Sequence, residues 1–419
     1  MWSTSYHYLY LHCSVHYITA VKSQWFAGTS GRCCNHSWPN SAGMARTSYP
    51  TVKPTVRVTQ FLYSGLGGHG SVVLSMISAD EGKCLDNRLV FYGIEATRQE
   101  YIDFCEERNV AFQSVIKKRG IDIASVLQIF RVLRRFRSEI TVLHSTTLIP
   151  LLVLYRIFFR TRLVFVEHNP NQVKKRIEWL WSWMGLAFAN RTIYLTNEYK
   201  EEVRSRLGWW MKDRKVAVIP NGIDTSLFAP SIAPPEIGRP HRLTMIARFT
   251  PTKDQSTLVR AFAILCNIQP DNNAELILAG DGSTKESVMN LAEELGVGQR
   301  VKFPGLLGEN SIVTLLKDTD IYVHASHGET MSTSIMQAMA CGLPVIGSDV
   351  MGIRNIIDGK NGFLFPDGDG PALASVLSRL LGDESACKET SLIARDYALR
   401  HFSATAMLEK YIAAFTADE

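Results

Sequence analysis

The sequence predicts an α/β protein made of two doubly wound parallel sheets that face each other across a cleft. Short apolar segments alternate with amphipathic segments along most of the 419 residues, which is typical of parallel strands joined by helices. The alternation stops in a proline-rich stretch and then restarts. Hydrophobic residues make up 46% and charged residues 20% of the chain, which excludes a disordered or collagen-like protein.

The two halves contribute comparable sets of elements. In the first half we expect strands over 56–63, 89–92, 140–144, 163–166, 192–195 and 216–219, with a helix over 71–78 after the first strand. In the second half we expect strands over 243–247, 275–279, 301–304, 321–324 and 344–346. Helices are expected there over 253–268, 284–295, 310–316 and 332–341.

The domain boundary is expected in a loop that holds five prolines, since proline interrupts regular structure: Pro220, Pro230, Pro234, Pro235 and Pro240. The first domain would span 44–221 and the second 222–395. A C-terminal helix within 396–419 would pack back on the first domain. Residues 1–43 contain only Lys22 and Arg32 as charged residues and show no sustained period. We expect them to be a disordered or non-native extension that precedes a start at Met44.

Charge is distributed unevenly along the chain. Residues 1–220 hold 29 Lys/Arg and 16 Asp/Glu, a net of +13, whereas residues 221–419 hold 16 and 24, a net of −8. The basic half favours an anionic partner, or else the two domains simply attract each other. Eight scattered cysteines suit a reducing compartment. The sequence contains no apolar run of 18 residues that would indicate a transmembrane helix.

A glycine-rich turn follows the first predicted strand. Gly65, Gly67, Gly68 and Gly70 form a G-x-G-x-x-G pattern between a strand and a helix, and such a turn lets a phosphate approach the helix N-terminus. Glu95 stands about where a ribose-binding acid would be. The pattern alone is weak, and it fits a phosphate or sugar loop as well as NAD.

The second half has more specific motifs at the ends of its predicted strands. Arg248 and Lys253 follow one strand, where a planar guanidinium and an ammonium could bind phosphate oxygens. Gly280 and Gly282 follow the next strand and permit either a tight turn or close approach of a ligand. Two cations at one strand end favour a binding role over a solvated surface.

A further motif surrounds the helix expected over 332–341. Ser332 and Thr333 stand at its N-terminus, where free N–H groups and hydroxyls favour an anion. Glu329 precedes the helix and Gln337 lies about a turn and a half into it. Gly342 is expected to end the helix. Plain capping of the helix is the simpler alternative for Ser332.

Other candidate groups have simpler explanations. The D-x-D triplets 318–320 and 367–369 could hold Mg²⁺ or Mn²⁺, but both read as turn residues, and no metal is expected. A P-loop motif is absent from the sequence. His144 and His168 each follow a predicted strand and should point into the cleft, either as substrate contacts or as structural groups.

Together these motifs resemble glycosyltransferase family 4, a family of retaining transferases with the GT-B fold of two Rossmann-like domains. The resemblance covers nearly the whole chain from about Val56. It rests on Gly67-Gly68, Glu167-His168, Val218 to Asp224, Arg248 with Lys253, Gly280-Asp281-Gly282, Glu329 to Gln337, Ala338 to Pro344 and Asp358 to Gly362.

The resemblance implies a nucleotide-diphosphate sugar bound mainly by the second domain. Arg248 and Lys253 would bind the diphosphate and stabilise its charge as it leaves. The amides and hydroxyls around Ser332 and Thr333 would assist them. Glu329 would contact the donor sugar, and His168 would line the sugar site from the first domain. The family's attack is thought to occur on the leaving-group face, so no protein nucleophile, metal or other cofactor is assigned.

One residue departs from the family pattern. The family usually shows Glu-x7-Glu, and Gln337 occupies the second position here. A neutral amide still accepts hydrogen bonds from a ribose but lacks charge assistance, which is worth roughly 1 kcal/mol. We therefore expect weaker nucleotide binding rather than loss of activity.

The resemblance implies transfer of a hexose or N-acetylhexosamine, from a UDP-sugar in preference to a GDP-sugar, to a glycan or lipid-linked acceptor in cell-surface polysaccharide synthesis. Two alternatives are an NAD-linked oxidoreductase that uses the Gly65–Gly70 loop and a catalytically silent sugar-nucleotide-binding relative. Base, sugar, acceptor, linkage and oligomeric state do not follow from the sequence.

The basic first half of the chain also suggests which surface of the protein meets the acceptor. Arg131, Arg134, Arg135 and Arg137 cluster on one segment, and the segment 174–183 mixes bases with three tryptophans. Such a composition suits a helix on an anionic membrane interface, although a tryptophan core is the alternative. We expect a cytoplasmic protein, peripheral on the inner face of the plasma membrane, with no nucleic-acid partner.

Overall fold

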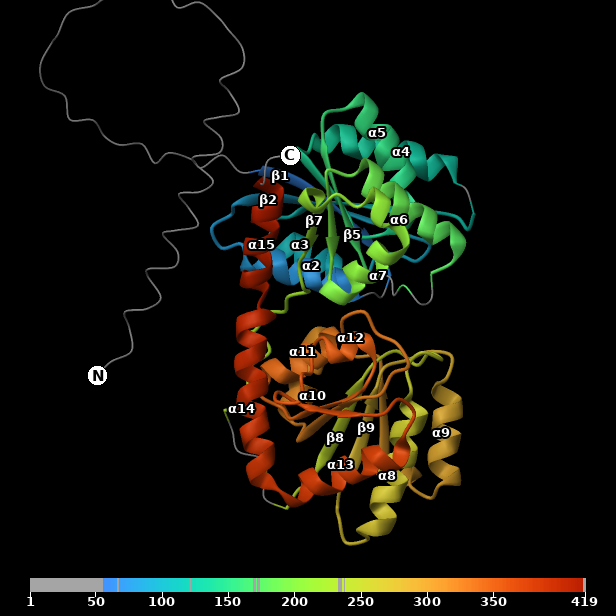
Figure 1. Cartoon of the computed structure of the whole chain (residues 1–419), viewed down its shortest axis with the longest axis vertical. Coiled ribbons are helices and arrows are strands. Elements are labelled where there is room, and N and C mark those ends of the chain that lie inside the picture. The colour runs from blue at the N-terminus through green and yellow to red at the C-terminus, as the bar shows by residue number, and fades with distance from the viewer. Residues whose placement is uncertain are drawn as a thin grey trace, which may run out of the picture.

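The computed structural model describes residues 56–65, 68–120, 122–168, 171, 174–232, 236 and 238–416. The expectation for residues 1–43, and Gly67 of the glycine-rich turn, lie outside these residues. The described chain forms two α/β domains, each with one parallel sheet (Figure 1). The predicted fold class is confirmed.

The first sheet has seven parallel strands in the order β3-β2-β1-β4-β5-β6-β7. They are β1 (Val56–Tyr63), β2 (Leu85–Gly93), β3 (Ala111–Ile116), β4 (Ile140–Leu143), β5 (Arg162–Glu167), β6 (Arg191–Tyr194) and β7 (Val216–Val218). The helices between them are α2 (Gly68–Ala79), α3 (Gln99–Glu107), α4 (Ile123–Phe136), α5 (Ile149–Phe158), α6 (Arg176–Phe188) and α7 (Asn197–Leu207).

Helices cover both faces of this sheet. Leu62 of β1 packs in a cluster with α2 and α3, whereas its neighbour Phe61 packs in a cluster with α4, α5 and α6. Successive side chains of a strand point to opposite faces, so a strand buried on both faces reads as a continuous apolar run. This is why most of the strands could be predicted.

The second sheet has six parallel strands in the order β10-β9-β8-β11-β12-β13. They are β8 (Arg242–Ile246), β9 (Glu275–Ala279), β10 (Val301–Gly305), β11 (Ile321–His324), β12 (Val345–Ser348) and β13 (Phe363–Phe365). Its helices are α8 (Gln255–Ile268), α9 (Lys285–Glu294), α10 (Glu309–Lys317), α11 (Thr333–Ala340), α12 (Met351–Arg354) and α13 (Gly370–Gly382).

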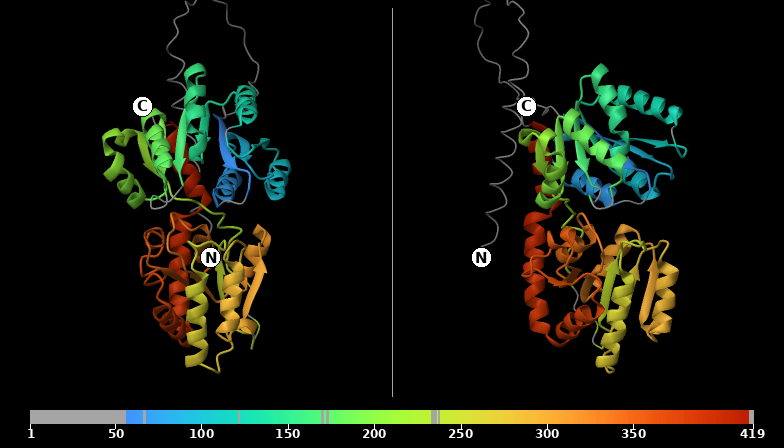
Figure 2. Two further views of the ribbon diagram at one scale, coloured as in Figure 1. Left: turned by 90° about the vertical axis from the view of Figure 1, so that its right-hand side faces the viewer. Right: turned by 45° about the vertical axis from the view of Figure 1, so that its right-hand side comes forward.

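The last two helices run along one side of both domains. α14 (Glu384–His401) lies beside the second domain and α15 (Ala404–Thr416) beside the first, where α15 contacts α2 (Figures 1 and 2). The backbone N–H of Ile223 donates to Phe402, and that of Ala404 donates to Ile223. The two segments that cross between the domains therefore lie side by side. Residues of both domains share one apolar cluster.

Candidate active site

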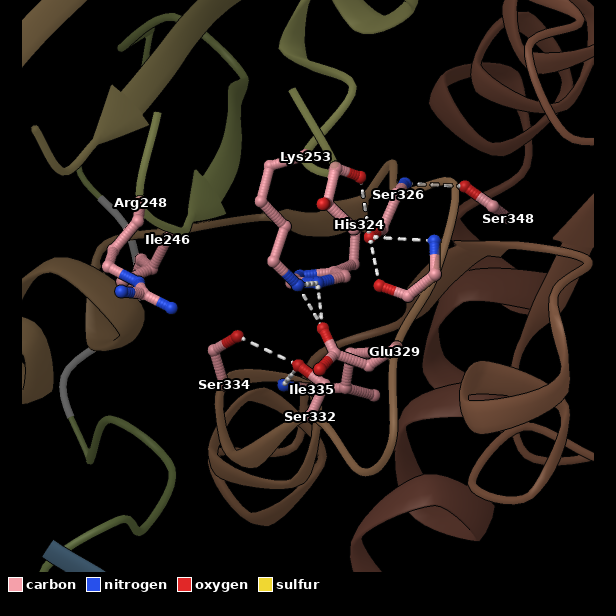
Figure 3. A network of polar contacts seen from close by, with 12 residues as sticks. Ile246, Arg248, Lys253, His324, Ser326, Glu329, Ser332, Ser334, Ile335 and Ser348 are labelled. Carbon is pink, nitrogen blue, oxygen red and sulfur yellow. Dashed lines mark hydrogen bonds and ion pairs between the residues drawn. The ribbon is translucent and has the colours of Figure 1, made fainter. Parts of the chain in front are cut away.

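The candidate site lies at the carboxyl ends of the strands in the second sheet, the edge where open α/β sheets bind ligands. The loop after β8 supplies Arg248 and Lys253, the loop after β11 supplies Glu329, and α11 supplies its N-terminus (Figure 3). A small cavity between the domains is lined by Tyr199 of α7 together with Glu329 and others. The site therefore faces the first domain.

Lys253, Glu329 and His324 form a compact polar cluster. The Lys253 ammonium makes an ion pair with the Glu329 carboxylate and lies 3.3 Å from His324 Nε2. His324 Nε2 is also 3.2 Å from Glu329 Oε2. The Lys253 and Glu329 side chains are only 16% and 17% exposed. Removal of one partner would leave the other charge in a poorly solvated position.

The protonation states follow from these contacts. Burial raises the pKa of Glu329, but the Lys253 charge and the hydrogen bond to His324 outweigh this effect and lower it to about 2. Burial and the Lys253 charge lower the pKa of His324. At neutral pH the cluster therefore contains an ionised carboxylate and a neutral imidazole.

Arg248 projects from the same sheet edge toward the first domain. Its side chain is exposed and lies apart from the Lys253 cluster (Figure 3). Burial and the hydrogen bond to Glu95 raise the pKa of Tyr63, and the Arg248 charge opposes this shift. The guanidinium is thus close enough to the end of β1 to act on it electrostatically.

Gly280 and Gly282 have a packing function that the sequence did not reveal. Both have positive φ angles, 141° and 147°. A Cβ at Gly280 would lie 2.0 Å from the carbonyl oxygen of Ala247, and one at Gly282 would lie 2.2 Å from that of Phe249. The two glycines therefore let this loop lie directly against the backbone that carries Arg248. A donor-binding role for them remains a prediction.

The start of α11 is where the sequence placed it. Ser332 is the N-cap, and its hydroxyl accepts a hydrogen bond from the Ile335 N–H at 3.5 Å. Thr333 is the first helical residue, and Gln337 is buried in the same helix. Gly342 follows the helix with φ 74°. Ser332 therefore caps the helix, as the simpler alternative expected, and an anion-binding role for Ser332 and Thr333 remains a prediction.

The first domain contributes a second group of predicted residues. His168 directly follows β5 and lies 3.0 Å from His144, measured between Nε2 and Nδ1. Gly68 is the first residue of α2. A Cβ at Gly65 would clash with the Glu95 carboxylate, which accepts a hydrogen bond from Tyr63. Thus Glu95 lies against the start of the glycine-rich turn.

Sequence reasoning assigned no role to His324 or Tyr322. Both belong to β11, and the Tyr322 hydroxyl lies 3.3 Å from His324 Nδ1. Tyr322 therefore helps to hold the His324 ring beside Lys253 and Glu329. A histidine as the last residue of a strand whose following loop holds Glu329 was the available signal.

The carboxylates of the two D-x-D triplets have partners. Asp320 accepts two hydrogen bonds from Arg239 at 2.7 Å, and Asp369 caps α13. Asp367 accepts from His327 at 2.8 Å, and with Asp254 these two residues form a group that could hold a metal ion. Both ring nitrogens of His327 face carboxylates, that of Asp254 at 3.6 Å and that of Asp367 at 2.8 Å.

Comparison with known proteins identifies the class of molecule. Residues 67–227 match the family model described as Glycosyltransferase Family 4, and residues 233–397 match that described as Glycosyl transferases group 1. The structure of Anabaena Alr3699/HepE in complex with UDP-glucose has a TM-score of 0.74 at 17% identity and covers 86% of this chain and 100% of that one. The fold is therefore the GT-B fold of two Rossmann-like domains. The chain belongs to the family 4 and group 1 glycosyltransferases.

Curated relatives match parts of the chain. D-inositol 3-phosphate glycosyltransferase of Corynebacterium glutamicum is 31% identical over 185 residues, 41% of this chain and 44% of the relative. The chain spans about half the length of the curated relatives of this name. UDP-Gal:alpha-D-GlcNAc-diphosphoundecaprenol alpha-1,3-galactosyltransferase of Escherichia coli is 26% identical over 285 residues, 63% of this chain and 71% of the relative.

Proposed function

We propose that this protein is a retaining glycosyltransferase that moves a hexose or N-acetylhexosamine from a UDP-sugar to a glycan or lipid-linked acceptor. The observation that carries the proposal is the placement of Arg248, Lys253 and the α11 N-terminus at one sheet edge facing the other domain. Two cations and a helix N-terminus suit the developing charge of a leaving diphosphate. A UDP donor and a lipid-linked acceptor are supported by the names of the relatives.

Each residue then has a distinct task. The Lys253 ammonium has three N–H donors, and its ion pair with Glu329 uses one of them, so donors remain for a diphosphate oxygen. Glu329, ionised and held in place, accepts hydrogen bonds from donor-sugar hydroxyls. Arg248 binds the diphosphate with its planar fork. No residue is assigned as a nucleophile, and the acceptor hydroxyl attacks on the face that the diphosphate leaves.

Binding of nucleotides to the full chain tests the donor class. We expect UDP at about 100 times its dissociation constant to raise the free energy of unfolding by about 2.7 kcal/mol, seen as a higher melting temperature. GDP, ADP and NADH at the same concentration should have smaller effects. Arg248→Ala should remove most of the UDP effect. Lys388→Ala, which removes an exposed lysine on α14, is the matched control and should respond like the wild type.

The outcomes separate the alternatives. A shift with NADH alone would overturn the proposal in favour of an oxidoreductase. A shift with UDP but no transfer from any UDP-sugar to glycan or lipid-linked acceptors would indicate a silent relative. The stereochemistry of a transferred sugar, read by NMR, decides whether transfer retains the anomeric configuration.

Peripheral attachment to an anionic membrane is a further part of the proposal. Among the described residues, no helix is both long and apolar enough to cross a bilayer. Trp179, Trp181 and Trp183 of α6 are half-buried against protein. In contrast, Trp209 is 95% exposed and, with Trp210, borders a groove of about 450 Å³ also lined by lysines. Tryptophan beside lysine is typical of an anionic membrane interface.

Sedimentation with vesicles tests this attachment. We expect the wild type to sediment with phosphatidylglycerol vesicles and not with phosphatidylcholine vesicles, because the surface is basic. The double variant Trp209→Ala/Trp210→Ala should lose at least tenfold in affinity, since each ring contributes on the order of 1–2 kcal/mol of apolar burial. Leu392→Ala, which truncates a 73% exposed leucine on α14, should bind like the wild type. Equal binding of all variants would contradict the assignment.

A further inference from the structure

Two residues that line the cavity between the domains each have a buried polar atom without a partner. Asn171 belongs to the segment between β5 and α6, and Thr330 follows Glu329 in the loop after β11. Among the described residues, neither Asn171 Oδ1 nor Thr330 Oγ1 has a hydrogen-bond partner, although both atoms are buried. Buried polar atoms are normally hydrogen-bonded, so this pair of atoms points to a group that binds between the domains.

The orientation of the Asn171 amide follows from its contacts. Its nitrogen donates to Glu202 Oε2 at 2.8 Å and to the carbonyl oxygen of Tyr199 at 3.4 Å. Both of these partners are acceptors, so the amide nitrogen faces α7 and the amide oxygen is left for another group. A ligand atom that meets this oxygen must be a hydrogen-bond donor.

The position of Thr330 is set by close packing of its backbone. A Cβ at Gly352 of α12 would clash with the carbonyl oxygens of Glu329 and Thr330. α12 therefore lies directly against this loop because residue 352 has no side chain. Thr330 is only 9% exposed, so its unpartnered hydroxyl belongs to a packed part of the cavity wall and not to a solvated surface.

The cavity suits a group of the size of a hydroxyl. Its volume is about 10 Å³, which is room for about one water molecule. Its lining offers acceptor oxygens from Asn171, Glu202 and Glu329, and the Thr330 hydroxyl can donate or accept. A sugar hydroxyl, which donates one hydrogen bond and also accepts, matches both the size and the chemistry of this cavity.

We propose that Asn171 and Thr330 are specificity-determining residues that bind one hydroxyl of the donor sugar in the cavity between the domains. The inference rests on the proposed function, in which Glu329 contacts the donor sugar. The hydroxyl donates to Asn171 Oδ1 of the first domain and accepts from the Thr330 hydroxyl of the second. The cavity thereby favours donors whose sugar places a hydroxyl at this point.

Titration calorimetry of the full chain without acceptor tests the proposal. The probes are UDP, UDP-glucose, UDP-galactose, UDP-N-acetylglucosamine and UDP-N-acetylgalactosamine, and the ratio of the UDP Kd to each UDP-sugar Kd isolates the contribution of the sugar. We expect the wild type to bind one UDP-sugar more tightly than UDP and than the other three. Thr330→Val and Asn171→Ala should each weaken binding of that UDP-sugar about tenfold, the effect of one lost hydrogen bond, and leave the UDP Kd unchanged.

A stability measurement and a control variant accompany the titrations. Thr330→Val replaces a hydroxyl with a methyl group of similar size. Because the hydroxyl has no partner among the described residues, the urea midpoint of the free protein should not fall, whereas a structural role of this hydroxyl would lower it. Thr314→Val removes an exposed hydroxyl on α10 that donates to Asn310, and this variant should bind every probe like the wild type.

The outcomes distinguish failure of this inference from failure of the proposed function. A wild type that binds neither UDP nor any UDP-sugar would overturn both. If UDP binding is intact, the inference alone is overturned by a wild type that binds no UDP-sugar more tightly than UDP. Unchanged affinity of Thr330→Val and Asn171→Ala for the preferred UDP-sugar would overturn it as well. An equal loss for UDP and UDP-sugar would show that these residues act on the nucleotide, which also contradicts the inference.

Discussion

Lys253→Ala is expected to lower sugar transfer by about two to three orders of magnitude, the effect typical of losing one electrostatic group at a developing charge. It should also destabilise the protein by about 3 kcal/mol, because the Glu329 carboxylate, 17% exposed, would lose its cation. Transfer rates with saturating donor and urea unfolding measure the two effects.

Paired variants separate the two effects. Lys253→Ala/Glu329→Gln should recover most of the lost stability, since no unpaired carboxylate remains, but should not recover transfer. Lys388→Ala, which breaks an ion pair whose side chains are 73% and 83% exposed, should change neither measurement. Near-normal transfer by Lys253→Ala would contradict the role proposed for this lysine.

The same pair predicts how stability depends on pH. The pKa of Glu329 is lowered to about 2 in the folded protein, so the folded state binds fewer protons than the unfolded state between pH 2 and about 4.5. The stabilisation that the Glu329 carboxylate gives to the folded state is therefore complete above pH 4.5 and is lost as the pH falls toward 2. Urea unfolding at pH 5, 4 and 3 should show a steeper loss for the wild type than for Glu329→Gln.

Deletion of residues 404–419 is expected to prevent stable folding of the first domain. α15 packs on α2 and buries Met407, Leu408, Tyr411 and Phe415 in the cluster that joins the domains. Four such side chains contribute about 6–10 kcal/mol in total, which is comparable with the whole stability of a typical domain. Circular dichroism and gel filtration of the shortened chain measure the result.

Single substitutions keep this expectation testable if the shortened chain aggregates. Phe415→Ala, at a site 4% exposed, should cost about 3–5 kcal/mol in urea unfolding. Glu409→Ala, on the exposed side of the same helix, should cost less than about 0.5 kcal/mol. A shortened chain with an unchanged urea midpoint would show that α15 is dispensable.

The fold could be predicted because most strands are buried on both faces. Two strands were not predicted, for physical reasons. β3 is an edge strand with Gln113 and Ser114 in its middle and only Val115 buried, and β13 has three residues. Neither leaves an apolar run of ordinary length in the sequence.

The candidate site was predictable in part. Arg248, Lys253 and Glu329 follow strands of one sheet, so their approach to the same edge follows from topology. The bond between His144 and Gln60 joins residues 84 positions apart, and no local pattern announces it. In the same way, the sequence shows tryptophans near basic residues both in α6 and at Trp209. Only the structure shows that those of α6 are half-buried and that Trp209 is exposed.

The two segments that cross between the domains bear on how the molecule moves. Ile223 and Ser403 form a single bridge between these segments, so both covalent connections lie on one line at one side of the molecule. We therefore expect any opening of the two domains to be a rotation about this line rather than a sliding of one sheet past the other. Such a rotation would displace the residues beside 221–224 and 402–404 least and those on the opposite side of the molecule most.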